Sequence, residues 1–248
     1  MIRFDLHTHT VFSDGENTPE EMVAYAEKNG IEILGISDHE YAPMQTSYCV
    51  SLENTPKYAE TINALKEKSK IKLYLGTERD YFSTESDIKY DYVIGSVHSI
   101  FKNGEYIDVD HSEKVMVDNV QRLYNGDYLE YVKAYYALVK NVVEKTKCDI
   151  VGHFDLVCKF NEGNKYFDES SEEYQKIALD AAKEIARSGK IVEINTGAIS
   201  RGYKTKPYPA GFLFDYFKEN NVKMILNSDS HSAENLCFKF DEFEALLK

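Results

Sequence analysis

A series of short apolar segments, each followed by a residue that can bind a metal, constrains this chain most strongly. The segment Phe4-Asp5-Leu6 is followed by His7-Thr8-His9. Side chains two residues apart on a strand point the same way, so His7 and His9 should project together. Further segments end in Asp38-His39, Val97-His98, Gly152-His153 and Ser228-Asp229-Ser230-His231. One histidine at a strand end is usually a hydrogen-bonded rim residue, whereas a whole set indicates a shared metal site.

The arrangement of these segments predicts the fold. Seven short runs read as strands, at residues 4–6, 31–36, 71–75, 92–97, 148–151, 191–194 and 222–226. They are rich in β-branched residues and several lack strict alternation, which is typical of strands covered on both faces. Helical patterns lie between them, at about 18–29, 54–69, 127–146, 171–188, 209–220 and 235–247. This alternation predicts right-handed crossovers and a parallel sheet.

Seven such units favour a TIM-like barrel, with the metal site at the carboxyl ends of the strands. A doubly wound open sheet is the alternative, because periodicity does not reveal closure. Residues 100–126 are the least regular, and we expect an insertion on the site face there. Residues 159–170 and 197–208 should be further long loops, which is where barrels keep their chemistry. We expect one domain over residues 1–248.

The composition argues against two classes of partner. The net charge is −13, from 29 Lys and Arg against 42 Asp and Glu, whereas a nucleic-acid surface needs a basic stripe. No run approaches the ~18 apolar residues of a membrane span, and no signal-peptide pattern follows Met1. The four cysteines are scattered without a C-x-x-C pair, so we expect reduced thiols and a cytoplasmic protein. The sequence makes no prediction of oligomeric state.

The residues of ligand type are too numerous for one ion. They are His7, His9, Asp14, Asp38, His39, Glu78, His98, His153, Asp229 and His231. Imidazole with carboxylate suits zinc, manganese or iron, and one ion takes four to six ligands. We therefore expect two or three divalent ions, with a carboxylate such as Glu78 bridging them. His111 lies in an irregular segment and is expected to be a surface residue rather than a ligand.

These motifs resemble those of the PHP (polymerase and histidinol phosphatase) superfamily. The matching pieces are His7-Thr8-His9, Ser13-Asp14-Gly15, Ser37-Asp38-His39, Gly76-Thr77-Glu78, Gly95-Ser96-Val97-His98, Gly152-His153 and Ser228-Asp229-Ser230-His231. They occur in family order across nearly the whole chain. The resemblance implies a distorted (β/α)7 barrel and a trinuclear metal site. It implies one ion at His7, His9, Glu78 and Asp229, a second at Glu78, His98 and His153, and a third at Asp14, His39 and His231. Asp38 would then orient an imidazole.

The chain also resembles the standalone histidinol-phosphatase branch of that family. The pieces that carry this resemblance are Gly152-His153-Phe154-Asp155-Leu156, Glu193-Ile194-Asn195-Thr196, and Arg201 followed by Pro207-Tyr208-Pro209. It implies hydrolysis of a small phosphate ester, L-histidinol phosphate, to L-histidinol and phosphate in histidine biosynthesis. Hydroxide held between two ions would attack phosphorus in line.

The same resemblance suggests which side chains act in the reaction. The catalytic candidates are Glu78, Asp155 and Arg201, and the substrate-binding candidates are Arg201, His39, Asp155 and Lys204. Arg201 would clamp a phosphoryl oxygen; its alternative is a solvated loop cation, as it is for Lys204. Asp155 could protonate the leaving alcohol, bind a substrate amine, or only accept a structural hydrogen bond.

Three other functions stay open. Another small phosphomonoester, such as a nucleoside monophosphate, could be the substrate. An amidohydrolase also begins with H-x-H after the first barrel strand, but that class usually wants a lysine at a mid-barrel strand end, where this chain has Glu78 and His98. A non-catalytic metal-binding domain would bind ions without turnover, and it would not need an open site.

Overall fold

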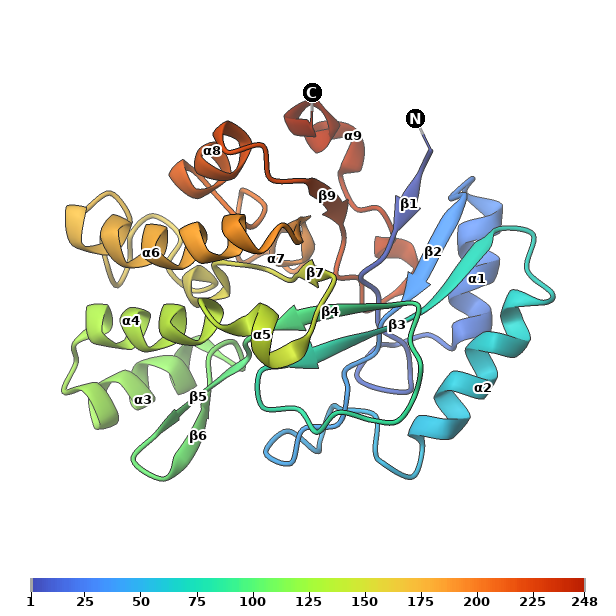
Figure 1. Ribbon diagram of the computed structural model, residues 1–248, viewed down its shortest axis with the longest axis horizontal. Coiled ribbons are helices and arrows are strands. Elements are labelled where there is room, and N and C mark those ends of the chain that lie inside the picture. The colour runs from blue at the N-terminus through green and yellow to red at the C-terminus, as the bar shows by residue number, and fades with distance from the viewer. Residues whose placement is uncertain (1, 248) are drawn as a thin grey trace.

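Seven parallel strands form the centre of the fold, and the computed structural model describes residues 2–247. In chain order the strands are β1 (Phe4–Asp5), β2 (Ile33–Ile36), β3 (Lys72–Asp80), β4 (Tyr92–Ser96), β7 (Ile150–Val151), β8 (Ile191–Asn195) and β9 (Met224–Asn227). Each pairs in parallel with the next, so their carboxyl ends lie at the same end of the sheet (Figure 1). All seven predicted strands are present.

The sheet closes between β1 and β9 through a seam rather than a full ladder. Thr8 and Ser230, just beyond the two strands, form a single parallel bridge. Closer to the two strands, a side chain replaces the backbone partner: the Asn227 Oδ1 accepts the Leu6 N–H at 3.1 Å. The predicted distorted (β/α)7 barrel is confirmed, and the open-sheet alternative is wrong.

Helices surround the strands (Figure 1). They are α1 (Pro19–Lys28), α2 (Thr55–Lys66), α4 (Tyr128–Val139), α5 (Val142–Thr146), α6 (Glu172–Ser188), α7 (Gly197–Ser200), α8 (Phe212–Glu219) and α9 (Phe240–Phe243). Short 3-10 turns follow at η1 (Leu156–Cys158), η2 (Ala233–Asn235) and η3 (Glu244–Leu247). The predicted helix start at Thr18 is confirmed by a capping box with Glu21. The helix predicted over 127–146 is divided into α4 and α5, and that over 235–247 is reduced to single turns.

The prediction that residues 100–126 are irregular is wrong. They contain an antiparallel hairpin, β5 (Ser99–Lys102) and β6 (Glu105–Asp108), and then α3 (Glu113–Tyr124). Asn103 and Gly104 both have positive φ and form the tight turn that an Asn-Gly pair favours. The side chain of Ser112 caps α3 by accepting the Val115 N–H. The hairpin and α3 lie beside α4 on one side of the barrel (Figure 1).

Apolar side chains line the interior of the barrel, away from the polar side chains that follow the strands. Tyr92 packs with Ile94, Ile150 and Ile225, and its hydroxyl donates to the Leu6 carbonyl. The ring occupies space that two neighbouring glycines leave open, since a Cβ at Gly35 or Gly76 would collide with it. The barrel is therefore a plugged core and not a pore.

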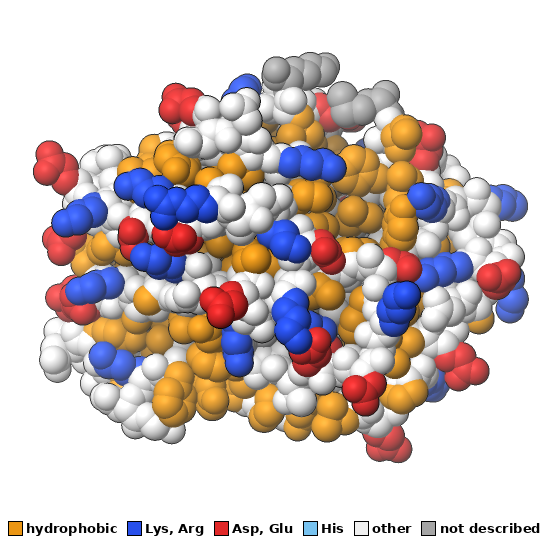
Figure 2. Space-filling model, viewed as in Figure 1, with side chains coloured by type: hydrophobic (Ala, Val, Ile, Leu, Met, Phe, Trp, Pro, Cys, Tyr) orange, Lys and Arg blue, Asp and Glu red, His pale blue; other side chains and the backbone are white. Residues whose placement is uncertain are grey.

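Within residues 2–247, no helix combines the length and apolar character needed to cross a bilayer. Figure 2 shows acidic and basic side chains intermixed over the face in view.

Candidate metal centre

The carboxyl end of the barrel brings together the side chains that follow the strands. His7 and His9 come after β1, His39 follows β2, Glu78 lies on β3, and His98 follows β4. The remaining members are His153 after β7, Asp229 and His231 after β9, and Asp14 in the turn that follows the first histidine pair. All nine predicted metal ligands therefore lie in one region, as the convergence of parallel strand ends requires.

Glu78 is at the centre of this region and is buried. Its Oε1 lies 2.9 Å from the Nε2 of His153 and 3.4 Å from that of His98. Its Oε2 faces the other way, 3.2 Å from the Nε2 of His7 and 3.0 Å from the Nδ1 of His39. The two oxygens of one carboxylate thus face two different sets of imidazoles, which is the arrangement expected of a carboxylate shared between ions.

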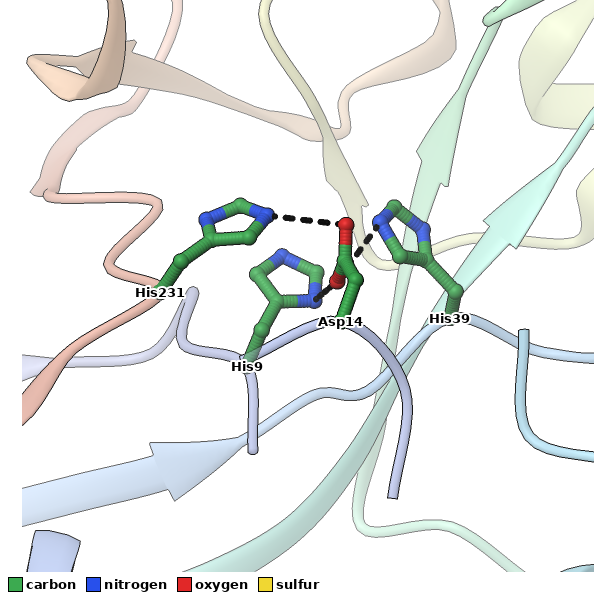
Figure 3. A group of neighbouring side chains, drawn as sticks. All are labelled: His9, Asp14, His39 and His231. Atoms are coloured by element: carbon green, nitrogen blue, oxygen red, sulfur yellow. Dashed lines mark ion pairs between the residues drawn. The ribbon is translucent and has the colours of Figure 1, made fainter. Parts of the chain in front are cut away.

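A second carboxylate, Asp14, is surrounded by imidazoles at the solvent side of the cluster. Figure 3 shows His9, His39 and His231 arranged around it. The Asp14 Oδ2 lies 3.3 Å from the Nε2 of His231, and its Oδ1 lies 3.7 Å from the Nε2 of His39 and 3.8 Å from the Nδ1 of His9. One ligand atom from each of these four residues lies within 4.8 Å of the others, close enough to share an ion.

A third group consists of His7, His9 and Asp229, whose ligand atoms lie within the same limit. The Oδ1 of Asp229 lies 3.3 Å from the Nε2 of His9. Asp229 has a φ of 51°, in the left-handed region that aspartate tolerates better than most residues. Such a conformation at a buried position is common at functional sites.

The geometry agrees in part with the ligand groups that the family resemblance implies. The expected third group, Asp14, His39 and His231, is present and also includes His9. His98 groups with Glu78 and His39, and the Nε2 of His153 lies 3.2 Å from that of His98. His9 and His39 therefore each stand between two groups, so the division of ligands among the ions stays a prediction.

The donor atoms fit divalent ions. The Nε2 of His7, both ring nitrogens of His9 and the Oε2 of Glu78 are buried without a hydrogen bond among the described residues. Buried polar atoms are normally satisfied, so several unpaired lone pairs facing one another need an explanation. Ions bound by imidazole and carboxylate would satisfy all of them.

The charges in the centre favour the ligand forms of the acids. Burial raises the pKa of Glu78, but the imidazoles of His7, His98 and His39 outweigh this and hold that pKa well below its usual range. Burial also raises the pKa of Asp14, and His39 and His231 lower it further than burial raises it. Both carboxylates are thus ionised at neutral pH, as metal binding requires.

The imidazoles fall into two kinds. Burial, reinforced by His231 and His39, lowers the pKa of His9 to about 3, so His9 is neutral and ready to coordinate. Burial lowers the pKa of His7 too, but Glu193 and Glu78 raise it well above the ordinary value. An ion that binds His7 must therefore displace a proton.

The residues that orient the imidazoles are not the ones that the sequence predicted. Asp38 accepts hydrogen bonds from the N–H and hydroxyl of Thr10, both at 2.7 Å, and from Ser13, so it holds the turn before Asp14 and contacts no imidazole. The prediction that Asp38 orients a histidine is wrong. Asp80 instead accepts the His98 backbone N–H at 2.7 Å and faces the ring Nδ1 at 3.3 Å. Its position two residues after Glu78 on β3 was the signal for it.

A cavity of about 270 Å³ opens over the cluster. Beyond the ligand candidates it is lined by Tyr48, Asp108, Asp110, His111, Leu156, Lys159 and Arg201. The Nη2 of Arg201 donates to the Asp229 Oδ2 at 2.9 Å, and its Nη1 donates to the Asp229 carbonyl at 3.1 Å. This close approach needs Gly197, because a Cβ there would lie 2.8 Å from both Arg201 Nη2 and Asp229 Oδ2.

Asp155 and Lys204 do not line this cavity. Both line a second cavity of about 420 Å³, which shares no lining residue with the first. The Asp155 Oδ2 accepts the Ala210 N–H at 3.1 Å, and burial raises the Asp155 pKa to about 7. Lys204 pairs with Glu162 at 3.1 Å. Asp155 and Lys204 therefore lie at a different cavity from the ligand candidates, and their contact with a substrate stays a prediction.

The sequence did not predict the cavity-lining residues Asp108, Asp110 and Lys159. Asp108 and Asp110 come from the end of β6 and the loop after it, and Lys159 comes from the turn after η1. The Lys159 Nζ donates to the Asp110 carbonyl at 2.8 Å and lies 3.2 Å from its carboxylate. Exposed His111 lies at the rim and belongs to none of the candidate ligand groups. Apart from the expectation of an insertion facing the site, no motif marked these residues.

A distorted barrel with a cluster of imidazoles and carboxylates at its carboxyl end defines a class of metal-dependent hydrolases. The chain belongs to the PHP domain family, whose model matches residues 5–197.

Relatives of known sequence cover nearly the whole chain. A Deinococcus radiodurans protein named "Probable histidinol-phosphatase" is 28% identical over 95% of this chain and 89% of its own length. The histidinol-phosphatase of Bacillus subtilis is 23% identical over 98% of both chains. The matches thus span most of the length of both relatives.

Solved structures confirm the architecture. A Listeria monocytogenes structure superposes with a TM-score of 0.85 over 97% of this chain and all of its own, at 22% identity, which shows the shared fold. Histidinol phosphate phosphatase from Lactococcus lactis, in complex with zinc, L-histidinol and phosphate, gives a TM-score of 0.74 at 25% identity. That match covers 99% of this chain and 92% of the other.

Proposed function

We propose that this chain is a metal-dependent phosphomonoesterase that hydrolyses L-histidinol phosphate to L-histidinol and phosphate. The observation that carries the proposal is the position of Glu78, between two sets of buried imidazoles, beneath a cavity that holds Arg201. Membership of the PHP family and the histidinol-phosphatase names of full-length relatives support the same reaction.

The proposed centre holds two or three divalent ions of zinc, manganese or iron. We assign one ion to His7, His9, Glu78 and Asp229, a second to Glu78, His98 and His153, and a third to Asp14, His39 and His231. When bound, such ions neutralise phosphoryl oxygens and lower the pKa of water toward neutrality, which supplies the nucleophile. Glu78 would be shared between ions, because its two oxygens face two different sets of imidazoles.

Arg201 is the proposed phosphate clamp. Asp229 holds its guanidinium at the cavity wall with two hydrogen bonds, and a guanidinium has five N–H donors in a fixed fork. Donors therefore remain for a phosphoryl oxygen, without any need for the side chain to leave Asp229. His39, beside the ring of Tyr48, also lines this cavity.

Asp108, Asp110 and Lys159 form an acidic wall of the cavity. This acidic wall supports a leaving group with a cationic nitrogen, such as the ammonium of L-histidinol. Asp108 is held in place by the hydroxyl of Ser99 at 3.0 Å, and Asp110 lies beside Lys159. Two carboxylates with one lysine leave this wall with a net negative charge. A nucleoside would bring no ammonium to it, so the wall favours the amino alcohol over a nucleoside monophosphate.

The test is a comparison of kcat/KM for L-histidinol phosphate, nucleoside monophosphates, p-nitrophenyl phosphate, and amide and lactone substrates. We expect L-histidinol phosphate to be the best substrate. A preference of orders of magnitude for another phosphomonoester would contradict the substrate assignment. Turnover of amides or lactones alone would support the amidohydrolase alternative, and bound metal without any turnover would support a non-catalytic domain.

The role of the acidic wall is tested with Asp110→Asn. A hydrogen bond to a charged group contributes about 1.5–3 kcal/mol, so we expect kcat/KM for L-histidinol phosphate to fall roughly 10- to 100-fold. The value for p-nitrophenyl phosphate, which has no cation, should change little. Asp118→Asn, which removes an exposed carboxylate on α3, is the matched control and should change neither value. Equal losses on both substrates would contradict recognition of a cationic leaving group.

A further inference from the structure

Glu193 is a buried acid whose surroundings point to a specific role. It is the third residue of β8, in the sequence Ile191-Val192-Glu193-Ile194, and its side chain has no exposed surface. An ionised carboxylate without solvent is costly unless donors surround it. Its neighbours must therefore supply the donors that compensate this charge.

Four donors surround the two oxygens of Glu193. The Oε2 lies 2.8 Å from the Nδ1 of His7 and accepts the side-chain N–H of Asn227 at 2.9 Å. The Oε1 accepts the backbone N–H of His153 at 2.6 Å and the side-chain N–H of Asn195 at 2.7 Å. With donors facing both of its oxygens, Glu193 acts as a hydrogen-bond acceptor only, which is the ionised form of the carboxylate.

This arrangement selects one tautomer of His7. Because its Nδ1 faces a carboxylate oxygen, that nitrogen keeps the proton in the neutral ring, and the lone pair of the neutral ring is on Nε2. Within residues 2–247 the Nε2 has no hydrogen bond, and it lies 3.2 Å from the Glu78 Oε2 and 3.7 Å from the Asp229 Oδ1. When His7 binds an ion it therefore coordinates through Nε2, while Nδ1–H stays on Glu193.

The other oxygen acts on a different ligand. By holding the backbone N–H of His153, Glu193 fixes where that residue leaves β7, and the His153 Nε2 then reaches the Glu78 Oε1 at 2.9 Å. His7 and His153 are assigned above to different ions. Glu193 therefore connects two ion sites through the two oxygens of one carboxylate.

We infer that Glu193 is a positioning residue for two metal ligands at once, His7 through its ring and His153 through its backbone. The inference rests on the proposed metal centre. Loss of the Glu193 charge should weaken binding at both ion sites, because partners that orient ligands typically contribute 10- to 100-fold to metal affinity.

The test is Glu193→Gln, which preserves the shape but places an NH2 group against either the His7 Nδ1–H or the His153 N–H. We expect metal dissociation constants, measured with zinc and a competing chelator, to rise about 10- to 100-fold, and less than the full metal content to survive dialysis. Glu193→Asp keeps the charge and should recover part of the affinity. Asp155→Asn is the matched control, since it also converts a buried carboxylate to an amide but contacts no imidazole, and it should keep its metal.

The result that would overturn the inference is a Glu193→Gln protein that binds zinc as tightly as the control. The unfolding of the metal-free proteins is compared as well, because a purely structural role would lower stability and leave affinity unchanged. If the variant does not fold, nitrogen-15 spectra of the zinc-loaded wild type decide, and a proton on His7 Nε2 would contradict the inference. Zinc binding without phosphatase activity would contradict the proposed function and leave the role of Glu193 intact.

Discussion

At the scale of single residues, the centre depends on carboxylates that serve more than one partner. Glu78 faces His98 and His153 with one oxygen and His7 and His39 with the other. Several partners are needed because a buried negative charge is tolerated only where donors or cations surround it. It also makes these acids the positions where one substitution should have the widest effect.

Glu78→Gln tests the proposed bridge. The amide has the same shape, so the fold should persist, but it lacks the charge that two ions would share. We expect a loss of bound metal and a fall in kcat/KM of more than about 100-fold, beyond the effect of a residue that only orients a ligand. Metal analysis and phosphatase kinetics on the same preparation are the measurement. Retention of both metal and activity would show that Glu78 does not bridge.

At the scale of elements, the two faces of β3 have different roles: one face presents Glu78 to the candidate metal centre, and the other holds a buried ion pair that stabilises the surrounding strands. Glu78 points into the barrel, and Arg79, the next residue, points the opposite way and pairs with Glu40. Arg79 also donates to the Thr146 carbonyl at 2.9 Å, just before β7. Since Glu40 follows His39, this buried pair connects the strands that supply three of the candidate ligands.

Arg79→Met should therefore destabilise the fold strongly. The methionine retains much of the side-chain length but leaves the Glu40 carboxylate buried without its cation, a change that typically costs about 3–5 kcal/mol. Denaturant unfolding of the metal-free protein measures this effect. Lys190→Met removes a partner from the exposed pair with Asp149 and should cost no more than about 1 kcal/mol. Similar losses for both variants would show that the buried pair has no special role.

At the scale of the whole molecule, the metal centre and the barrel seam are parts of one structure. The single bridge between Thr8 and Ser230 joins the chain segments that supply His7, His9 and Asp229. The barrel closes where the ligands are, so ions that hold these ligands together should also hold the ends of the barrel together. Stability should consequently depend on metal.

Metal removal by a chelator should lower the free energy of unfolding by roughly 4 kcal/mol when the ion had been present at 1,000 times its Kd. The effect should be larger at pH 8 than at pH 6. Carboxylates raise the pKa of His7 and His98 against the effect of burial, so the metal-free fold gains stability from these protons at low pH and loses it as pH rises. Metal binding must displace the same protons and is therefore favoured at high pH. Thermal unfolding with and without chelator at both pH values is the measurement, and an equal difference at both would contradict this linkage.

The strands and the ligand set could be read from the sequence because both depend on local pattern. A β-branched run predicts a strand, and parallel strands necessarily bring their carboxyl ends to one rim, so His39, His98 and His153 could be placed near one another without coordinates. The hairpin and α3 also had local signals, in Asn103-Gly104 and Ser112, although the irregular region around them concealed these.

The side chains that surround the candidate metal ligands were decided by the tertiary structure alone. Asp155 is two residues from His153, yet it faces a different cavity, and Asp38 is next to His39 but holds a turn. Asp110 and Lys159 meet at the cavity wall although 49 positions separate them. The direction of a loop side chain depends on packing against distant segments, which no local pattern encodes. The sequence by itself therefore determined the barrel and the candidate metal ligands that meet at its carboxyl end, and only the folded chain decided which other side chains line the cavity above them.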